Sequence, residues 1–171
     1  MKQEPMRKPT QDALQSKSRG VKGKSSSKIP KRVKQPSKKT IKDKAWRAFS
    51  KYIRLRDCLK TTGSLEYGEC VSCDRTFPFA LLDAGHFIPR KSGNYFSERG
   101  VNAQCRSCNR FHGGNQLEYR KEIIRRYGEG IDLELEEEAR QIRKYTPQDL
   151  VALAEEYKNK TNELLKMKLK G

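Results

Sequence analysis

Apolar side chains recur at helical spacing between residues 42 and 57, where Trp46, Phe49 and Ile53 fall on one face. Basic residues occupy most of the positions between them. The pattern predicts an amphipathic helix that packs this stripe on the core. The alternative is that Trp46 and Phe49 stack on nucleic-acid bases.

Turn residues and hydrophobic periodicity divide the rest of the chain into short segments. We expect, in order, short strands and turns over 58–82, a loop-rich stretch over 83–104, a helix beginning near 107–110, and helices over 116–127, 132–144 and 147–168. Thr146 and Asp149 have the spacing of a capping box, with Pro147 in the first helical turn. Polar residues at 158–162 leave the apolar stripe of the last helix incomplete.

Positive charge concentrates at the N-terminal end of the 171-residue chain, whose net charge is +17. Residues 1–44 hold 15 Lys or Arg and 3 acidic residues, whereas residues 45–171 hold 23 and 18. Because residues 1–40 contain scarcely any apolar side chains, we expect a disordered basic tail. Such a tail favours a polyanion partner, nucleic acid above all, although it could simply keep the protein soluble.

The sequence has no apolar run long enough to span a membrane, and its polar N-terminus lacks the apolar stretch of a signal peptide. No segment pairs basic residues with a strongly apolar face, so membrane binding is disfavoured. We therefore expect a cytoplasmic protein. In that reducing compartment, paired cysteines are more often metal ligands than disulfides.

Four of the five cysteines form two C-x2-C pairs, Cys70 with Cys73 and Cys105 with Cys108. The two-residue gap lets both thiolates of a pair reach one ion, and four thiolates complete the tetrahedral shell of zinc. A complete shell predicts a structural zinc site. The alternatives are buried free thiols or a redox pair. Cys58 stands apart and is interpreted as an ordinary buried cysteine.

The polar residues gather between and just after these pairs. The segment from Asp83 to Arg90 reads DAGHFIPR and includes His86, and Asn109 directly follows the last cysteine of the second pair. In this order the residues resemble the ββα-metal (HNH-like) nuclease motif. Over residues 42–165 the sequence resembles the phage NinG/Rap recombination endonucleases, and its motif order is similar to that of phage endonuclease VII. A single histidine, taken alone, could simply cap a strand.

The resemblance implies a metal-dependent endonuclease that hydrolyses branched DNA, such as Holliday junctions, during phage recombination. It implies that His86 is the general base and that Asp83 and Asn109 bind a catalytic Mg²⁺ or Mn²⁺. Asn102 is the candidate to brace the histidine loop within the catalytic set. The sequence departs from many HNH-type sites because Gly85, not an acidic residue, precedes the histidine.

Basic side chains near the predicted site are expected to hold the DNA backbone. The candidate DNA-binding residues are Arg90, Lys91, Arg99, Arg106, Arg110 and His112. Each could instead belong to a solvated basic rim, and His112 could bind metal. Three rival functions remain open: a non-catalytic zinc-ribbon DNA-binding protein, an HNH nuclease of nicking, restriction or homing type, and, ranked last, a structural phage or RNA-binding protein.

The expected fold class is α+β, with a small zinc-stapled ββα-metal core surrounded by helices. The predicted organisation is a disordered basic tail at 1–40, a nuclease core with its leading helix at 41–130, and C-terminal helices at 131–171. Symmetric cleavage of a junction requires two active sites, so we expect a homodimer. The C-terminal helices are its predicted interface.

Overall fold

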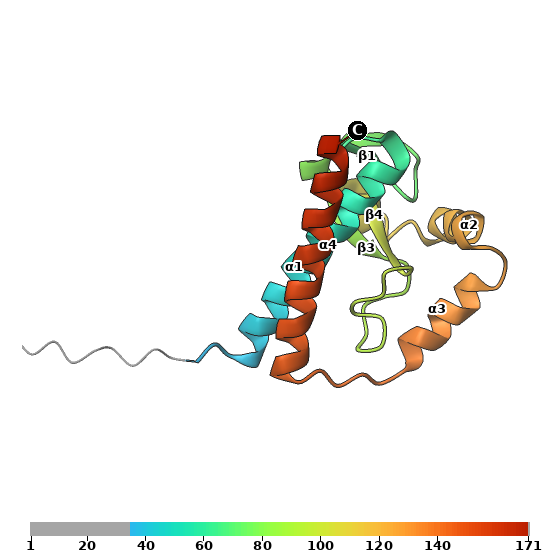
Figure 1. Ribbon diagram of the computed structural model, residues 1–171. Coiled ribbons are helices and arrows are strands. Elements are labelled where there is room, and N and C mark those ends of the chain that lie inside the picture. Colours follow the sequence, from blue (N-terminus) through green and yellow to red (C-terminus); the bar gives the residue numbers. More distant parts are fainter. Residues whose placement is uncertain (1–34, 171) are drawn as a thin grey trace, which may run out of the picture. The chain divides into compact units, whose positions relative to one another are not determined.

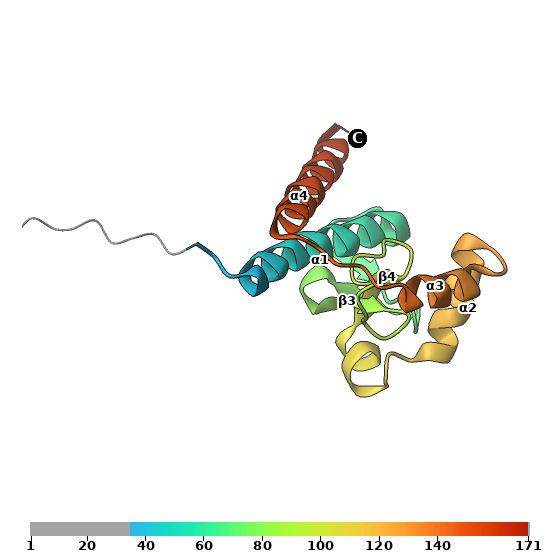
Figure 2. The same ribbon diagram turned by 90° about the horizontal axis from the view of Figure 1, so that it is seen from below.

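The computed structural model describes residues 35–170, which belong to one unit of the chain. A hairpin of two strands lies between the first helix and the second, and the last helix packs against the first (Figures 1 and 2). The elements are α1 (Lys38–Thr62), β1 (Tyr67–Glu69), β2 (Thr76–Pro78), η1 (Phe79–Leu81), β3 (Leu82–His86), β4 (Val101–Cys105), η2 (Ser107–Phe111), α2 (Gln116–Tyr127), α3 (Ile131–Arg140) and α4 (Pro147–Lys170). The architecture is α+β, as predicted.

Helix α1 is longer at both ends than its apolar stripe predicts. The side chain of Ser37 accepts a hydrogen bond from the Thr40 amide and so begins the helix, and Gly63 ends it in a left-handed conformation with φ of 65°. Helix α1 starts at Lys38, two residues before the predicted end of the tail at residue 40. The rest of the predicted tail, residues 1–34, lies outside the described residues.

The stripe on α1 packs into the core, as predicted. Phe49 and Ile53 are fully buried, and Trp46 packs against the same cluster. The apolar positions of α4 complete this cluster, with Leu150 and Tyr157 buried in it. The ring centroids of Phe49 and Tyr157 lie 4.8 Å apart in an edge-to-face arrangement, which is favourable for aromatic pairs.

Strands β3 and β4 form an antiparallel pair in which Asp83 lies opposite Gln104 and Gly85 lies opposite Asn102. The prediction of a loop-rich stretch over 83–104 was wrong at both ends. Each strand has only five residues, and the buried residues of β4 include two amides. Apolar and polar residues alternate in β4, but five residues give only a weak sequence signal, and the polar Asn102 and Gln104 are buried and held by hydrogen bonds.

The helices after the hairpin agree well with the sequence pattern. Helix α2 has the predicted bounds, and α3 ends four residues before the predicted limit of 144. The amide of Thr146 donates to Asp149 (2.8 Å) and the amide of Asp149 donates back to Thr146 (3.1 Å). This reciprocal pair confirms the predicted capping box at the start of α4.

Helix α4 does not form a separate C-terminal unit. Its apolar face lies against α1 within one chain, where Leu150 and Tyr157 are buried. The described residues on both sides of the predicted division at residue 131 belong to one compact unit. The homodimer and its interface stay predictions. Within residues 35–170, no helix combines the length and the apolar character needed to cross a membrane.

Candidate functional site

The four paired cysteines converge on one point. The sulfur atoms of Cys70, Cys73, Cys105 and Cys108 all lie within 4.8 Å of one another. Backbone amides point at them: the amide of Cys105 donates to the Cys70 sulfur (3.3 Å) and that of Cys108 to the Cys105 sulfur (3.4 Å). Amide donors of this kind stabilise thiolates. The cluster could bind a metal such as zinc, with all four positions of a tetrahedral shell supplied by the protein.

Local structure explains why the cysteines meet. The first pair follows β1 in a tight turn that ends at Asp74, which has a positive φ of 51°. The second pair spans the end of β4 and the single helical turn η2. A backbone hydrogen bond from Val71 to Ala103 (2.9 Å) ties the two segments together. A metal at this point would hold η2 against the hairpin, and η2 also carries the next polar residues of interest.

A cleft of about 310 Å³ lies beside β3, which among the described residues pairs only with β4. Its walls come from α1, β3, η2 and the loop after β3. The lining residues are Trp46, Ser50, Arg54, Leu82, Asp83, Ala84, Arg90, Asn109 and Arg110. Charged and polar groups dominate, and they include one carboxylate and three arginines. Such a cleft suits a phosphate-bearing ligand better than an apolar one.

Asp83 and Asn109 face each other in this cleft. The side-chain amide of Asn109 donates to Oδ2 of Asp83 (3.0 Å), and Arg110 donates to both carboxylate oxygens (2.7 Å each). Burial raises the pKa of Asp83, but the hydrogen bonds from Arg110 and Asn109 outweigh burial and leave the pKa below its usual value. The carboxylate is therefore ionised at neutral pH, and a cation in the cleft would meet a charged oxygen ligand.

His86 does not line the cleft. Its ring stacks on Trp46 with centroids 5.3 Å apart, and its Nε2 lies 3.3 Å from the carbonyl oxygen of Tyr95. Burial, followed by the positive charge of Arg90, lowers the pKa of His86 to about 4, so the imidazole is neutral at neutral pH. Trp46 and Arg90 line the cleft, and the ring of Trp46 stacks on His86. The histidine therefore lies behind a single layer of side chains that line the cleft.

The alternation of side chains along β3 explains the missing acid before the histidine. Residues two apart share a face of a strand, so Asp83 and Gly85 face η2 and α2 while His86 faces α1. A Cβ atom at position 85 would collide with the Gln104 side chain, 3.0 Å from its Cβ and closer still to its Oε1. An acid at 85 would therefore have to displace the Gln104 side chain, and the nearest position on that face is 83.

Asn102 is fully buried and acts as a brace. Its amide nitrogen donates to the carbonyl oxygen of Arg99 (3.0 Å) and to the hydroxyl of Tyr119 (3.3 Å), and its oxygen accepts from Arg56 and Arg126 (3.2 Å each). All of its hydrogen-bonding groups are engaged, so it cannot contact a substrate. These contacts leave no group of Asn102 for a direct catalytic role, and its bond to Arg99 holds the loop before β4. The bracing of the histidine loop stays a prediction.

Sequence reasoning missed a buried ion pair beside this brace. Asp57 is 1% exposed, and it accepts hydrogen bonds from its neighbour Arg56 (2.8 Å) and from the backbone amide of Ala103 (2.6 Å). Arg56 also donates to the carbonyl oxygens of Glu98 and Val101. The pair fastens α1 to β4. Charged residues on a basic amphipathic helix give no sequence signal of burial, because most such residues are solvated.

The predicted DNA-binding residues fall into different environments. Arg90 and Arg110 line the cleft, whereas Arg99 is paired with Glu134 (2.9 Å) on α3. Arg106 donates to the carbonyl oxygen of Ala80 (2.9 Å).

Two further predicted residues, Lys91 and His112, are exposed. His112 shares hydrogen bonds with Ser107 of the same turn (3.1 Å to its carbonyl oxygen) and takes no part in the cysteine cluster. The structure therefore brings only Arg90 and Arg110 to the cleft, and the other four lie outside its lining.

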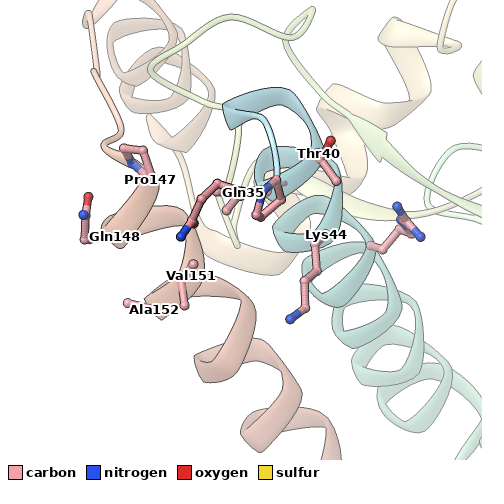
Figure 3. A pocket seen from close by; sticks show the side chains of 10 residues that line it. Gln35, Thr40, Lys44, Pro147, Gln148, Val151 and Ala152 are labelled. Atoms are coloured by element: carbon pink, nitrogen blue, oxygen red, sulfur yellow. The ribbon is translucent and has the colours of Figure 1, made fainter. Parts of the chain in front are cut away.

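A second cavity of about 830 Å³ lies between the first turns of α1 and α4. Figure 3 shows Lys44 on α1 and Val151 on α4 at opposite sides of this groove. Its other lining residues include Pro36, Ile41 and Ala152. The groove contains no carboxylate, histidine or cysteine, so it offers no metal ligand and no general base. It is a packing groove between two helices, separate from the candidate site.

Comparison with known proteins places the sequence among phage proteins. The family whose profile matches residues 1–167 is described as "Bacteriophage Lambda NinG protein". The chain is 32% identical over 139 residues to "Protein ninG" of Escherichia phage lambda and, over the same length, to "Protein ninG" of Salmonella phage P22. Each alignment covers 80% of this chain and 63% of the relative, so the chain spans less than two thirds of these curated relatives. No solved structure matches the chain.

Proposed function

This chain belongs to the NinG family of lambda-like phage proteins, and on that premise we propose that it is a metal-dependent endonuclease acting on branched DNA. The observation that carries the proposal is the direct contact between Asp83 of β3 and Asn109 of η2 in a cleft lined by three arginines. Two oxygen-bearing side chains and surrounding positive charge are the elements that phosphodiester hydrolysis with one metal ion requires.

Asp83 and Asn109 would hold a hard divalent cation such as Mg²⁺ or Mn²⁺ through their side-chain oxygens. When bound, such a cation supplies a Lewis acid that polarises the phosphate and offsets negative charge on the leaving oxygen. Arg110 now occupies both carboxylate oxygens of Asp83. Its guanidinium would move to the phosphate of the DNA, since bidentate pairing with phosphate replaces the pairing with carboxylate.

His86 would accept a proton from the attacking water. Its neutral ring is the required form, and with Nε2 donating to Tyr95 it is Nδ1 that can accept. Part of its low pKa comes from the charge of Arg90. A phosphate bound to Arg90 would offset that charge and raise the pKa of His86 toward the range in which a general base is effective.

The test is cleavage of a labelled four-way junction by the full chain, with Mg²⁺ and with EDTA, beside a linear duplex of the same sequence. Asp83→Ala, Asn109→Ala and His86→Ala should each lower the cleavage rate by about 100-fold or more and leave binding intact. His112→Ala and Asn162→Ala are the matched controls, because both residues are exposed and neither lines the cleft.

A non-catalytic zinc-dependent DNA-binding protein is the second candidate, favoured by the position of His86 outside the cleft. That function predicts junction binding without cleavage in wild type under every metal condition. Cleavage that persists in Asp83→Ala would also overturn the proposed active site. Cutting of linear duplex at one sequence, with the junction ignored, would retain the nuclease and overturn its substrate class.

A further inference from the structure

The positive charge of the described chain is strongly one-sided. Between residues 38 and 56 of α1 the sequence has eight Lys or Arg and a single acidic residue, Asp43. Between residues 116 and 140, which contain α2 and α3, it has five basic and eight acidic residues. One side of the fold is therefore basic and the other acidic. The net charge of the whole chain does not reveal that basic and acidic residues lie on different helices.

Ion pairing sharpens the contrast. On α2 and α3, Lys121 pairs with Glu118, Arg125 with Glu122 and Arg140 with Glu137. On α1, by contrast, none of four exposed basic side chains has a carboxylate partner among the described residues. These four are Lys39, Lys44, Arg47 and Lys51. Their charge is available to an external anion.

Three of these residues continue in a line into the cleft. Lys44, Arg47, Lys51 and Arg54 follow one another at spacings of three, four and three residues, which places them on one side of the helix. Arg54 lines the cleft and donates to the carbonyl oxygens of Phe79 and Leu82 (3.4 and 3.3 Å), so the row ends at the strand that carries Asp83.

The dimensions and chemistry of this basic row fit a nucleic-acid backbone. Ten residues of helix rise about 15 Å, which is long enough for several flexible cations to contact successive phosphates of one DNA strand. A membrane surface would require apolar side chains beside the charges. Within the described residues, the large exposed hydrophobic side chains lie on other elements and none is on α1.

A second pair of cations borders the cleft nearby. The ammonium group of Lys42 lies 3.7 Å from the ring centroid of Tyr95, and the guanidinium of Arg90 lies 5.2 Å from the same ring. Neither has a carboxylate at ion-pair distance in residues 35–168. Two like charges held on one ring repel each other, and a bound phosphate would relieve that repulsion.

We propose that the basic row of α1, from Lys44 through Arg47 and Lys51 to Arg54, is the surface that holds a duplex arm of the DNA by its phosphates and directs it into the cleft. This inference rests on the proposed function for its partner, but it concerns binding and not catalysis. It also disfavours Arg99 as a DNA contact, because its charge is already paired with Glu134 on the acidic side of the fold.

The experiment measures fluorescence anisotropy of labelled duplex and four-way junction with the full chain, without added divalent metal, over a series of salt concentrations. The triple variant Lys44→Gln, Arg47→Gln, Lys51→Gln should bind about 100-fold more weakly at 0.15 M salt, since each lost phosphate contact costs roughly fivefold. The slope of log affinity against log salt should fall by about 2–3. All three side chains are exposed, so the fold should be retained.

The matched control removes the same charge from the acidic side, as Lys121→Gln, Arg125→Gln, Arg140→Gln. It should change affinity less than about threefold, because these cations are already paired. A charge-preserving variant, Lys44→Arg with Lys51→Arg, should bind like wild type. Equal losses in the row variant and the acidic-side control would overturn the inference.

Two further outcomes separate this inference from the proposed function. The wild-type chain could bind DNA in a salt-dependent way without cleaving it, and the row variant could lose that binding. This result would support the basic row as the DNA-binding surface and overturn the nuclease proposal. If the row variant still binds and cleaves DNA, the nuclease proposal is supported and the basic row is not the DNA-binding surface. Binding to an acidic peptide in place of DNA would overturn both.

Discussion

The side chain of Asn109 donates a hydrogen bond to Asp83 across 3.0 Å, although 26 residues separate them in the chain. Asn109 directly follows Cys108, a member of the cysteine cluster, and Asp83 lies on the strand that pairs with the approach to Cys105. The cluster and the cleft therefore share one structural support. Whatever loosens the cysteines should also displace the amide from the carboxylate.

We predict that the wild-type chain binds one zinc ion and that Cys73→Ser abolishes this binding. Loss of the metal should lower the melting temperature strongly, because structural zinc contributes on the order of 10 kcal/mol to folding in small zinc domains. Elemental analysis by mass spectrometry and thermal melting by circular dichroism measure the two effects. Cys58→Ala is the control, since Cys58 lies in a different cluster and should retain full zinc. Zinc retained by Cys73→Ser would contradict the assignment.

Gly85→Ala should destabilise the protein by about 1–3 kcal/mol, the usual cost of overpacking a filled site. The added methyl would meet the side chain of Gln104, which donates to Ser72 (2.7 Å) and to the carbonyl oxygen of Gly114 (2.5 Å) and so cannot swing away. Urea unfolding measures the loss. Combined with Gln104→Ala, the substitution should cost less than the two single changes added together. Strict additivity would show that the two side chains do not meet.

The stability contributed by His86 should depend on pH. Its pKa is about 4 in the folded chain and 6.5 in the unfolded one, so the unfolded state binds the proton more readily between these values. The contribution is therefore complete above pH 6.5 and is lost as the pH falls toward 4, by about 2–3 kcal/mol. His86→Phe should remove this loss and retain the stacking on Trp46.

Urea unfolding of wild type and His86→Phe at pH 7, 5.5 and 4 measures the difference. The comparison with the variant matters because carboxylates and cysteines also respond to acid. His112→Phe alters the other histidine, which is exposed, and should follow the wild-type curve. Parallel curves for wild type and His86→Phe would contradict the low pKa.

Asp57→Ala should destabilise the fold by about 3–5 kcal/mol, because it leaves the Arg56 guanidinium without its partner in a mostly buried position. The amide of Ala103 also loses its acceptor. Glu137→Ala, which breaks the exposed pair with Arg140, should cost less than about 1 kcal/mol. Denaturant unfolding compares the two, and similar losses would show that Asp57 is not a fastener between α1 and β4.

The sequence by itself determined the features that depend on local spacing. The stripe of Trp46, Phe49 and Ile53, the capping box at Thr146 and the two cysteine pairs are all set by residues a few positions apart, where backbone geometry fixes which side chains can meet. These predictions agree with the structure. The order of short motifs along the sequence was also sufficient to identify the NinG family.

Tertiary structure decided what depends on residues far apart. The buried pair of Arg56 and Asp57 has no local signature, because its acceptors and donors come from segments more than 40 residues away. The strands at 82–86 and 101–105 were missed because each has only five residues, and the pairing that buries amides such as Asn102 joins segments distant in the sequence. Ion pairing in the folded protein also decided which basic side chains remain free to bind an external anion. The sequence does not show whether a carboxylate from another helix reaches a given Lys or Arg.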